Sequence, residues 1–154
     1  MKRSSVALLA LAMSSPLLAD PPAQVMNILR EPDLKFVQSK MNPGISQAVI
    51  SGNPADPGKV YVVRNRFAPG TFSAPHFHPE TRYIAVLKGT WWVGSGPKFD
   101  KDATTPVPAG SFVVHHPNQI HWDGAKDEEA VVQITGVGPS ATIRVDEAGR
   151  PKDN

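Results

Sequence analysis

Proline and glycine interrupt this chain every few residues, and only short apolar runs lie between them. The 154 residues include 16 prolines and 12 glycines. Both residue types weaken helices and favour turns, because proline lacks a backbone N–H and glycine is conformationally free. No long amphipathic helix is evident between them. The pattern predicts an all-β chain of about nine to eleven short strands, in a sandwich or closed barrel.

Several apolar runs have the composition and alternation of strands. The clearest are rich in β-branched residues and span 45–50, 59–67, 111–115 and 130–135. Residues 82–93 (RYIAVLKGTWWV) predict a hairpin that turns at Lys88 and Gly89, and the polar residues 98–105 predict a surface loop.

The first residues follow the order of a secretory signal. Lys2 and Arg3 give a basic start, residues 6–13 (VALLALAM) are apolar, and Ala19 or, as a second choice, Ala23 offers a small residue for cleavage. The apolar run is far shorter than the roughly 20 residues of a membrane-spanning helix. We therefore expect residues 1–19 to be a signal peptide. The mature protein is then secreted, most simply to a bacterial periplasm, with no membrane association after cleavage.

The length allows one domain with its own core. After the signal we expect an N-terminal arm with edge strands at 20–55, one β-barrel at 56–146 and a polar tail at 147–154. Cysteine is absent, so neither a disulfide nor a thiolate ligand is available. Cleavage would leave 14 basic and 14 acidic residues, without the Lys/Arg cluster that binds phosphates. Nucleic acid is thus not an expected partner.

One residue separates His76 from His78. Side chains alternate along a strand, so both imidazoles leave the same face, roughly 6.5–7 Å apart along the chain. Two nitrogens at that spacing can close on one metal ion at roughly 2.0–2.2 Å. His121, from a neighbouring strand, would complete a three-histidine site with positions open for water, substrate or dioxygen. Taken alone, a His-x-His pair indicates no more than a polar strand.

The residues around these histidines resemble the two motifs of the cupin superfamily. The first motif is Gly-x5-His-x-His-x3–4-Glu-x6-Gly, and it is matched here by Gly70, His76, His78 and Gly89. The second is Gly-x5-Pro-x-Gly-x2-His, and its places are held here by Gly110, His116, Asn118 and His121. The resemblance covers about residues 60–135.

The resemblance implies the cupin fold, a double-stranded β-helix or jelly-roll barrel. It also implies a divalent transition metal (iron, manganese, zinc, nickel or copper) held by His76, His78 and His121. The adjacent His115 and His116 face opposite ways on a strand, so one of them can point into the barrel, but neither is expected to be a ligand. Arg64, Arg66 and Gln133 are placed on strands that could line the cavity.

Arg82 stands where the cupin motif has its metal-binding glutamate. Arginine stays protonated and has no lone pair to offer a metal. Two roles are open for Arg82: contact with an anionic substrate, or a salt bridge to Glu80. Glu80 itself is expected to be solvated or paired with Arg82, because the loop register disfavours it as a fourth ligand.

Two functions fit this reading. One is a metal-dependent enzyme, a dioxygenase, lyase or isomerase acting on a small organic acid. The alternative is a module that binds a small ligand or a sugar without turnover, and the arginine at position 82 favours it. No residue is assigned as catalytic. A homodimer is expected, since edge strands of this fold often pair between subunits.

Overall fold

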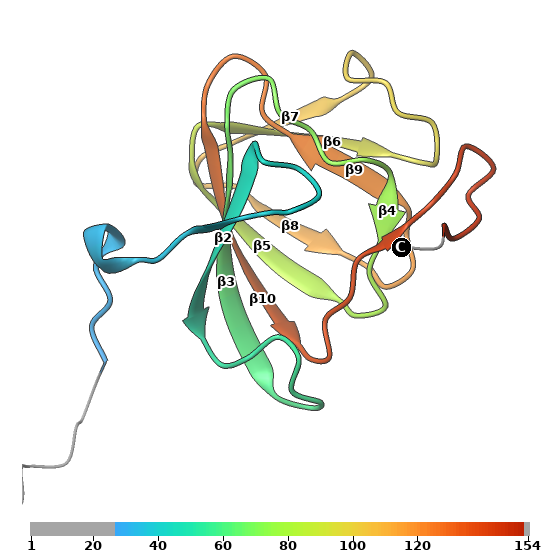
Figure 1. Ribbon diagram of the computed structural model, residues 1–154. Coiled ribbons are helices and arrows are strands. Elements are labelled where there is room, and N and C mark those ends of the chain that lie inside the picture. Colours follow the sequence, from blue (N-terminus) through green and yellow to red (C-terminus); the bar gives the residue numbers. More distant parts are fainter. Residues whose placement is uncertain (1–26, 153–154) are drawn as a thin grey trace, which may run out of the picture.

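A computed structural model describes residues 27–152 (Figure 1). Eleven strands and one short 3-10 helix, η1 (Glu31–Asp33), make up the regular structure of this range. The predicted signal peptide, residues 1–19, lies outside the described residues. Within the described part of the chain, no helix is long and apolar enough to cross a membrane.

The strands form two antiparallel sheets. The first has six strands, in the order β1 (Val37–Gln38), β2 (Ile45–Ser51), β3 (Val60–Phe67), β10 (Ala130–Val137), β5 (Arg82–Lys88) and β8 (Phe112–His115). The second has five, in the order β11 (Ile143–Arg144), β4 (His76–Phe77), β9 (His121–Gly124), β6 (Thr90–Ser95) and β7 (Thr105–Pro108). This confirms the predicted all-β jelly roll.

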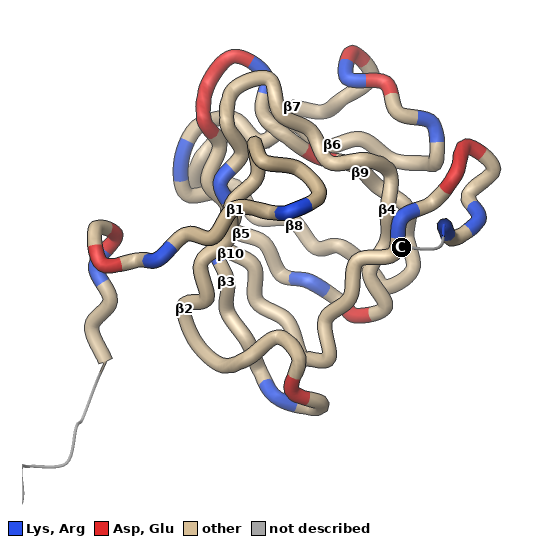
Figure 2. Tube along the Cα trace, viewed as in Figure 1, with Lys and Arg blue, Asp and Glu red and all other residues tan. Residues whose placement is uncertain are grey.

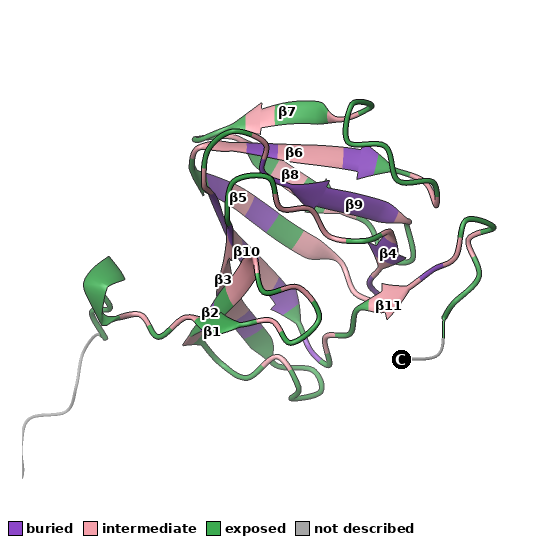
Figure 3. Cartoon of the chain, turned by 45° about the horizontal axis from the view of Figure 1, so that its top comes forward, coloured by how far each residue is buried: buried purple, intermediate pink, exposed green. Residues whose placement is uncertain are grey.

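The core lies between the two sheets, where the inward side chains of both meet. β9 is buried along its whole length (Figure 3). β3 and β10 alternate instead, with Tyr61, Val63 and Phe67 directed inward and their neighbours more exposed. The alternation follows from the two-residue period of a strand with one face on the core.

The predicted hairpin at residues 82–93 is wrong, because its two strands belong to different sheets. β5 pairs with β10 and β8, whereas β6 pairs with β7 and β9. Gly89 joins them at a corner with a φ of 66°. A side chain there would also collide with the carbonyl oxygen of Glu129, so this corner requires glycine.

The segment predicted as a loop at residues 98–105 ends sooner than expected, because Thr105 already begins β7. β7 contains Pro106 and Pro108, which cannot donate to a ladder and argue against a strand in the sequence. β7 tolerates them because it lies at the edge of the five-stranded sheet.

Candidate metal centre

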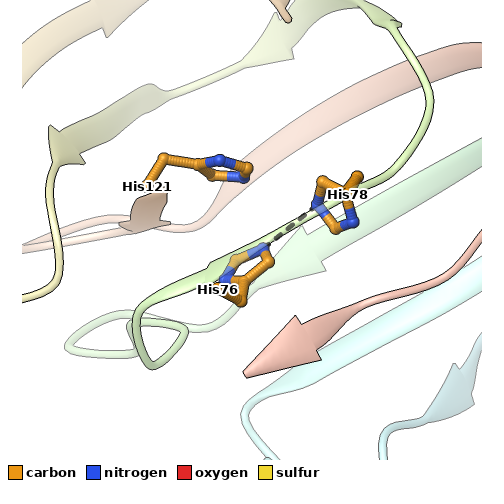
Figure 4. A group of neighbouring side chains, drawn as sticks. All are labelled: His76, His78 and His121. Carbon is orange, nitrogen blue, oxygen red and sulfur yellow. Dashed lines mark hydrogen bonds between the residues drawn. The ribbon is translucent and has the colours of Figure 1, made fainter. Parts of the chain in front are cut away.

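The strand register brings the three predicted histidines together. On the five-stranded sheet, His76 of β4 lies directly opposite His121 of β9. His78 lies two residues after His76 and points to the same side. All three are buried, and their ligand nitrogens lie within 4.8 Å of one another. Figure 4 shows the imidazoles converging on a common centre. They form a group that could hold a metal ion.

Each of these imidazoles is oriented by a backbone carbonyl. The Nδ1–H groups donate to Ala74 at 2.7 Å (from His76), Ala141 at 2.7 Å (from His78) and Gln119 at 2.9 Å (from His121). A neutral imidazole that donates from Nδ1 keeps a bare lone pair on Nε2. The three Nε2 atoms are therefore the ones available to a metal, as in sites whose ligands are oriented by outer hydrogen bonds.

The bare nitrogens fit a cation. Nε2 of His76 and Nε2 of His78 lie 3.1 Å apart (dashed line in Figure 4). Two lone pairs that face each other repel unless a proton or a metal ion lies between them. Nε2 of His121 is buried and has no hydrogen-bond partner among the described residues. Such atoms carry a desolvation cost that a bound ion would offset.

Burial keeps two of the ligand imidazoles, those of His78 and His121, neutral. It lowers the pKa of His78 far below its ordinary value, and the positive charge of Arg82 lowers it further. Burial also lowers the pKa of His121 to about 3, with the neighbouring His115 contributing. Only neutral imidazole ligates metal, so near neutral pH no proton has to be removed from these two residues.

Arg82 points into the barrel because of its place in the sheet. Four inward residues lie opposite one another across β3, β10, β5 and β8, namely Tyr61, Gly136, Arg82 and His115. The Arg82 guanidinium donates from Nη1 to Nε2 of His78 at 2.9 Å and from Nη2 to Oγ of Ser140 at 2.6 Å. It therefore contacts the histidine group directly.

Glu80 is the counter-ion of Arg82. Its Oε1 accepts from Nε of Arg82 at 2.9 Å and from the hydroxyl of Tyr61 at 3.0 Å. Its side chain is only 10% exposed, so of the two predicted roles it has the paired one and not the solvated one. Burial alone would raise the pKa of Glu80, but the nearby Ser140 hydroxyl and the charge of Arg82 outweigh burial and lower it. The carboxylate is ionised near neutral pH.

Two further ionisable residues lie beside the histidine group. The His115 ring centroid is 3.9 Å from that of His121. Burial lowers the pKa of His115, although the negative charge of Asp123 opposes this shift. Asp123 follows His121 by two residues on the same strand face, is buried, and accepts from Oγ of Ser73 at 2.6 Å. The two-residue spacing from His121 could have identified Asp123 in the sequence. The orientation of His115 needed the sheet register.

A cavity of about 1060 Å³ adjoins the site. Its polar lining includes His76, His78, Arg82, His115 and Asp123, and its apolar lining includes Phe67, Phe72, Ile84 and Ile134. The strands of Arg64, Arg66 and Gln133, β3 and β10, do line the cavity, but not through these three residues. Asn65 does so instead, since β3 turns alternate residues inward, and Nε of Arg64 donates to Oε1 of Gln133 at 3.0 Å. Elsewhere along the described chain, Lys and Arg are interspersed with Asp and Glu (Figure 2).

No protein-family model matches this sequence, and none of the curated proteins matches it either. Solved structures do match. A cupin-2 domain from Rhodospirillum rubrum is 16% identical with a TM-score of 0.64, over 80% of this chain and 82% of that one. The polyketide cyclase RemF from Streptomyces resistomycificus is 16% identical with a TM-score of 0.63, over 79% and 88%. A protein with a cupin-like fold from Ralstonia eutropha is 17% identical with a TM-score of 0.65, over 84% and 76%.

At these identities the likeness concerns the fold. The strand order, the two facing sheets and the similar structures agree with the motif spacing around His76, His78 and His121. The protein has the cupin fold, a double-stranded β-helix.

Proposed function

We propose that the protein binds a divalent transition metal through His76, His78 and His121 and acts with it on an organic acid. The supporting observation is the convergence of three Nε2 atoms that carry no proton and whose rings are each oriented by a backbone carbonyl. A metal held by three imidazoles with open positions supplies Lewis-acid chemistry or, for iron, dioxygen chemistry. The neutral donor set leaves the metal its full charge for an anionic ligand.

Arg82 would orient that ligand. A guanidinium has five N–H donors, and Arg82 uses three of them on Glu80, His78 and Ser140. Nη1 and Nη2 each keep one N–H that can donate to a carboxylate in the cavity.

The alternative, a module that binds a small acid or a sugar without turnover, has one observation in its favour. Arg82 takes the place of the carboxylate ligand and puts a cation 2.9 Å from Nε2 of His78. A positive charge there weakens metal binding and makes a catalytic metal harder to retain.

Elemental analysis of protein purified without added metal tests the first part of the proposal. We expect about one equivalent of metal, lost in His78→Ala and kept in the matched control His116→Ala, whose side chain is exposed. Full metal content in His78→Ala would rule out the site.

A screen of organic acids then separates an enzyme from a binding module. Oxygen uptake and product formation are measured with and without a chelator. Turnover that the chelator abolishes supports the enzyme. One equivalent of metal without turnover on a broad panel supports the binding module, and turnover without metal contradicts the proposed mechanism.

We also propose that the protein is exported to the periplasm and that the N-terminal signal is removed. The basic start and the short apolar run of residues 1–19 support this. Cell fractionation and N-terminal sequencing of the mature protein test it. A mature chain that starts at Asp20 or Gln24 is expected, and a chain in the cytosol that keeps Met1 would contradict it.

A homodimer is proposed through the outer face of the six-stranded sheet. Tyr83, Leu87, Phe112 and Val114 are exposed there, and the rings of Tyr83 and Phe112 stack at 6.5 Å. An apolar surface of this kind on a soluble protein indicates an interface. Light scattering should give the mass of a dimer that Phe112→Asp converts to a monomer, and a monomeric parent protein would disprove the proposal.

A further inference from the structure

We infer that the ligand is amphipathic, with an anionic head at the histidines and an apolar body that lies along an apolar shelf at the cavity mouth. The shelf consists of the inward-facing apolar residues of β1 and β2, which are Val37, Ile45 and Val49. The head group rests on the proposed function. The shelf rests on strand register, exposure and cavity shape.

The shelf extends the apolar inner face of the six-stranded sheet past the part that the five-stranded sheet covers. One row of directly paired residues runs across five strands of the six-stranded sheet, through Val49, Val63, Ile134, Ile84 and Val113. Paired residues share a face, so all five side chains look inward. Val63 is only 3% exposed, whereas Val49 is 55% exposed. The apolar row therefore extends onto β2, where the facing sheet no longer covers it.

A second row shows the same arrangement. Val37, Gln47, Asn65 and Val132 are paired across β1, β2, β3 and β10. Val37 lies at the outer end and is 71% exposed. One hydrogen bond joins the two amides between the valines, since Nε2 of Gln47 donates to Oδ1 of Asn65 at 2.9 Å. This row thus has an exposed valine at its outer end and a buried valine on β10, with a linked amide pair between them.

The shelf has a wall on its other side. Leu29, Leu34 and Met41 of the N-terminal arm line the same cavity. Arg66 holds the arm in place, because its guanidinium bonds Oε1 of Glu31 at 2.7 Å and lies 3.8 Å from the centroid of the Phe36 ring. An apolar space with walls of the same chain suits a small molecule better than the flat face of a second protein.

The size of the cavity agrees with a ligand larger than a simple acid. Its volume of about 1060 Å³ lies just above the usual range for ligand sites, roughly 300–1,000 Å³. A two- to four-carbon acid bound at the histidines would not cover the apolar residues of the shelf and the N-terminal arm, which would stay in contact with water. His78 and Val49 line the same cavity, so the head of an acid with an apolar tail can lie at the histidines while its tail lies on the shelf.

Titration calorimetry with n-alkanoates tests the inference. Acetate, hexanoate and decanoate are titrated, below micellar concentrations, into protein whose metal content has been measured. Each methylene that leaves water favours binding, so we expect decanoate to bind at least tenfold more tightly than acetate. Equal affinities for the three acids would overturn the inference.

A pair of matched variants locates the effect. Val49→Asp removes shelf surface, whereas Val60→Asp changes an equally exposed valine (61%) that β3 turns to the outer face. We expect Val49→Asp to abolish the preference for decanoate and to leave acetate binding unchanged, and Val60→Asp to change neither. The inference is wrong if the two variants behave alike. It is also wrong if Val49→Asp only dissociates an oligomer and decanoate affinity stays as it was.

His78→Ala separates this inference from the proposed function. We expect it to weaken the binding of acetate and of decanoate by the same factor, because it removes the head-group site and leaves the shelf intact. If His78→Ala leaves the affinities for acetate and decanoate unchanged and decanoate is still preferred, the proposed metal-centred function is wrong and the inference about the shelf is supported. If the parent protein binds acetate and decanoate equally and His78→Ala weakens the binding of both, the inference about the shelf is wrong and the proposed metal centre is supported.

Discussion

Nη1 of Arg82 donates to Nε2 of His78 at 2.9 Å, and so it occupies the lone pair that a metal ion would use. One lone pair cannot serve a guanidinium proton and a metal at the same time. Because Arg82 cannot give up its proton near neutral pH, metal binding requires the guanidinium to move away from His78. Arg82 is in this sense a competitor of the metal as well as a possible contact for an anion.

Removal of that competitor should strengthen metal binding. We expect Arg82→Gln to bind metal at least tenfold more tightly than the parent protein, since it takes away both the donor on His78 and a nearby positive charge. Competition against a fluorescent chelator measures the affinity. Arg64→Gln is the matched control, because Arg64 bonds to Gln133 instead. Equal affinities of the two variants would contradict the competitor role.

The same variant should be less stable. Arg82→Gln leaves the carboxylate of Glu80 buried without its counter-ion, and loss of one partner of a buried pair costs about 3–5 kcal/mol. The double variant Glu80→Gln/Arg82→Gln removes both charges and should recover most of that loss. Urea denaturation gives the free energies of unfolding. A single variant as stable as the double one would show that the pair does not stabilise the fold.

Gly136 lies between Tyr61 and Arg82 in the inward row of the six-stranded sheet. An added Cβ would lie 2.5 Å from the Tyr61 hydroxyl, which donates to Glu80. We expect Gly136→Ala to lose about 1–3 kcal/mol of stability through overpacking. Thr135→Ala, one residue earlier and on the other face, should change stability by less than about 0.5 kcal/mol. Equal effects in thermal denaturation would refute this packing role.

Metal-free protein should lose stability as the pH falls from 7 to 5. The pKa of His121 is about 3 in the folded protein and about 6.5 when unfolded. The unfolded chain therefore binds the proton first, and the free energy of unfolding falls with pH by up to about 1.4 kcal/mol per unit for this residue. His78, whose pKa is also lowered, acts in the same direction.

Urea denaturation at pH 7, 6 and 5 in the presence of a chelator measures this slope. His121→Gln should make the slope of the free energy of unfolding against pH shallower. His116→Ala, which changes an exposed side chain, should leave the slope unchanged. A stability that does not change over this interval would contradict the buried, neutral state of the histidines.

The sequence was sufficient for the features that depend on local spacing. His76 and His78 share a face because a strand has a period of two, and this needs no knowledge of the partner strands. The motif spacing then led to His121, which β9 places directly opposite His76. The strand at residues 60–67 was likewise recognisable from its β-branched run.

Features that depend on the partner strand were not predictable. Alternation along residues 82–93 identifies two strands but not the sheet to which each belongs, so the Gly89 corner was interpreted as a hairpin. The direction of His115 depends on its pairing with Arg82, and the role of Asn65 depends on which face of β3 turns inward. For Arg82, the sequence identified the missing ligand, but its contact with His78 follows from the sheet.

The pairing of Arg82 with Glu80 also restricts the order in which substitutions could convert this site into one with a glutamate ligand. A glutamate at position 82 beside an unchanged Glu80 would bury two carboxylates together, and like charges at that distance cannot both stay ionised. If Glu80 is replaced first, the Arg82 guanidinium lacks its carboxylate partner only until position 82 is replaced as well. In that interval it lies beside a cavity open to water and anions. Between a three-histidine centre and a four-ligand one, the accessible path therefore begins at position 80.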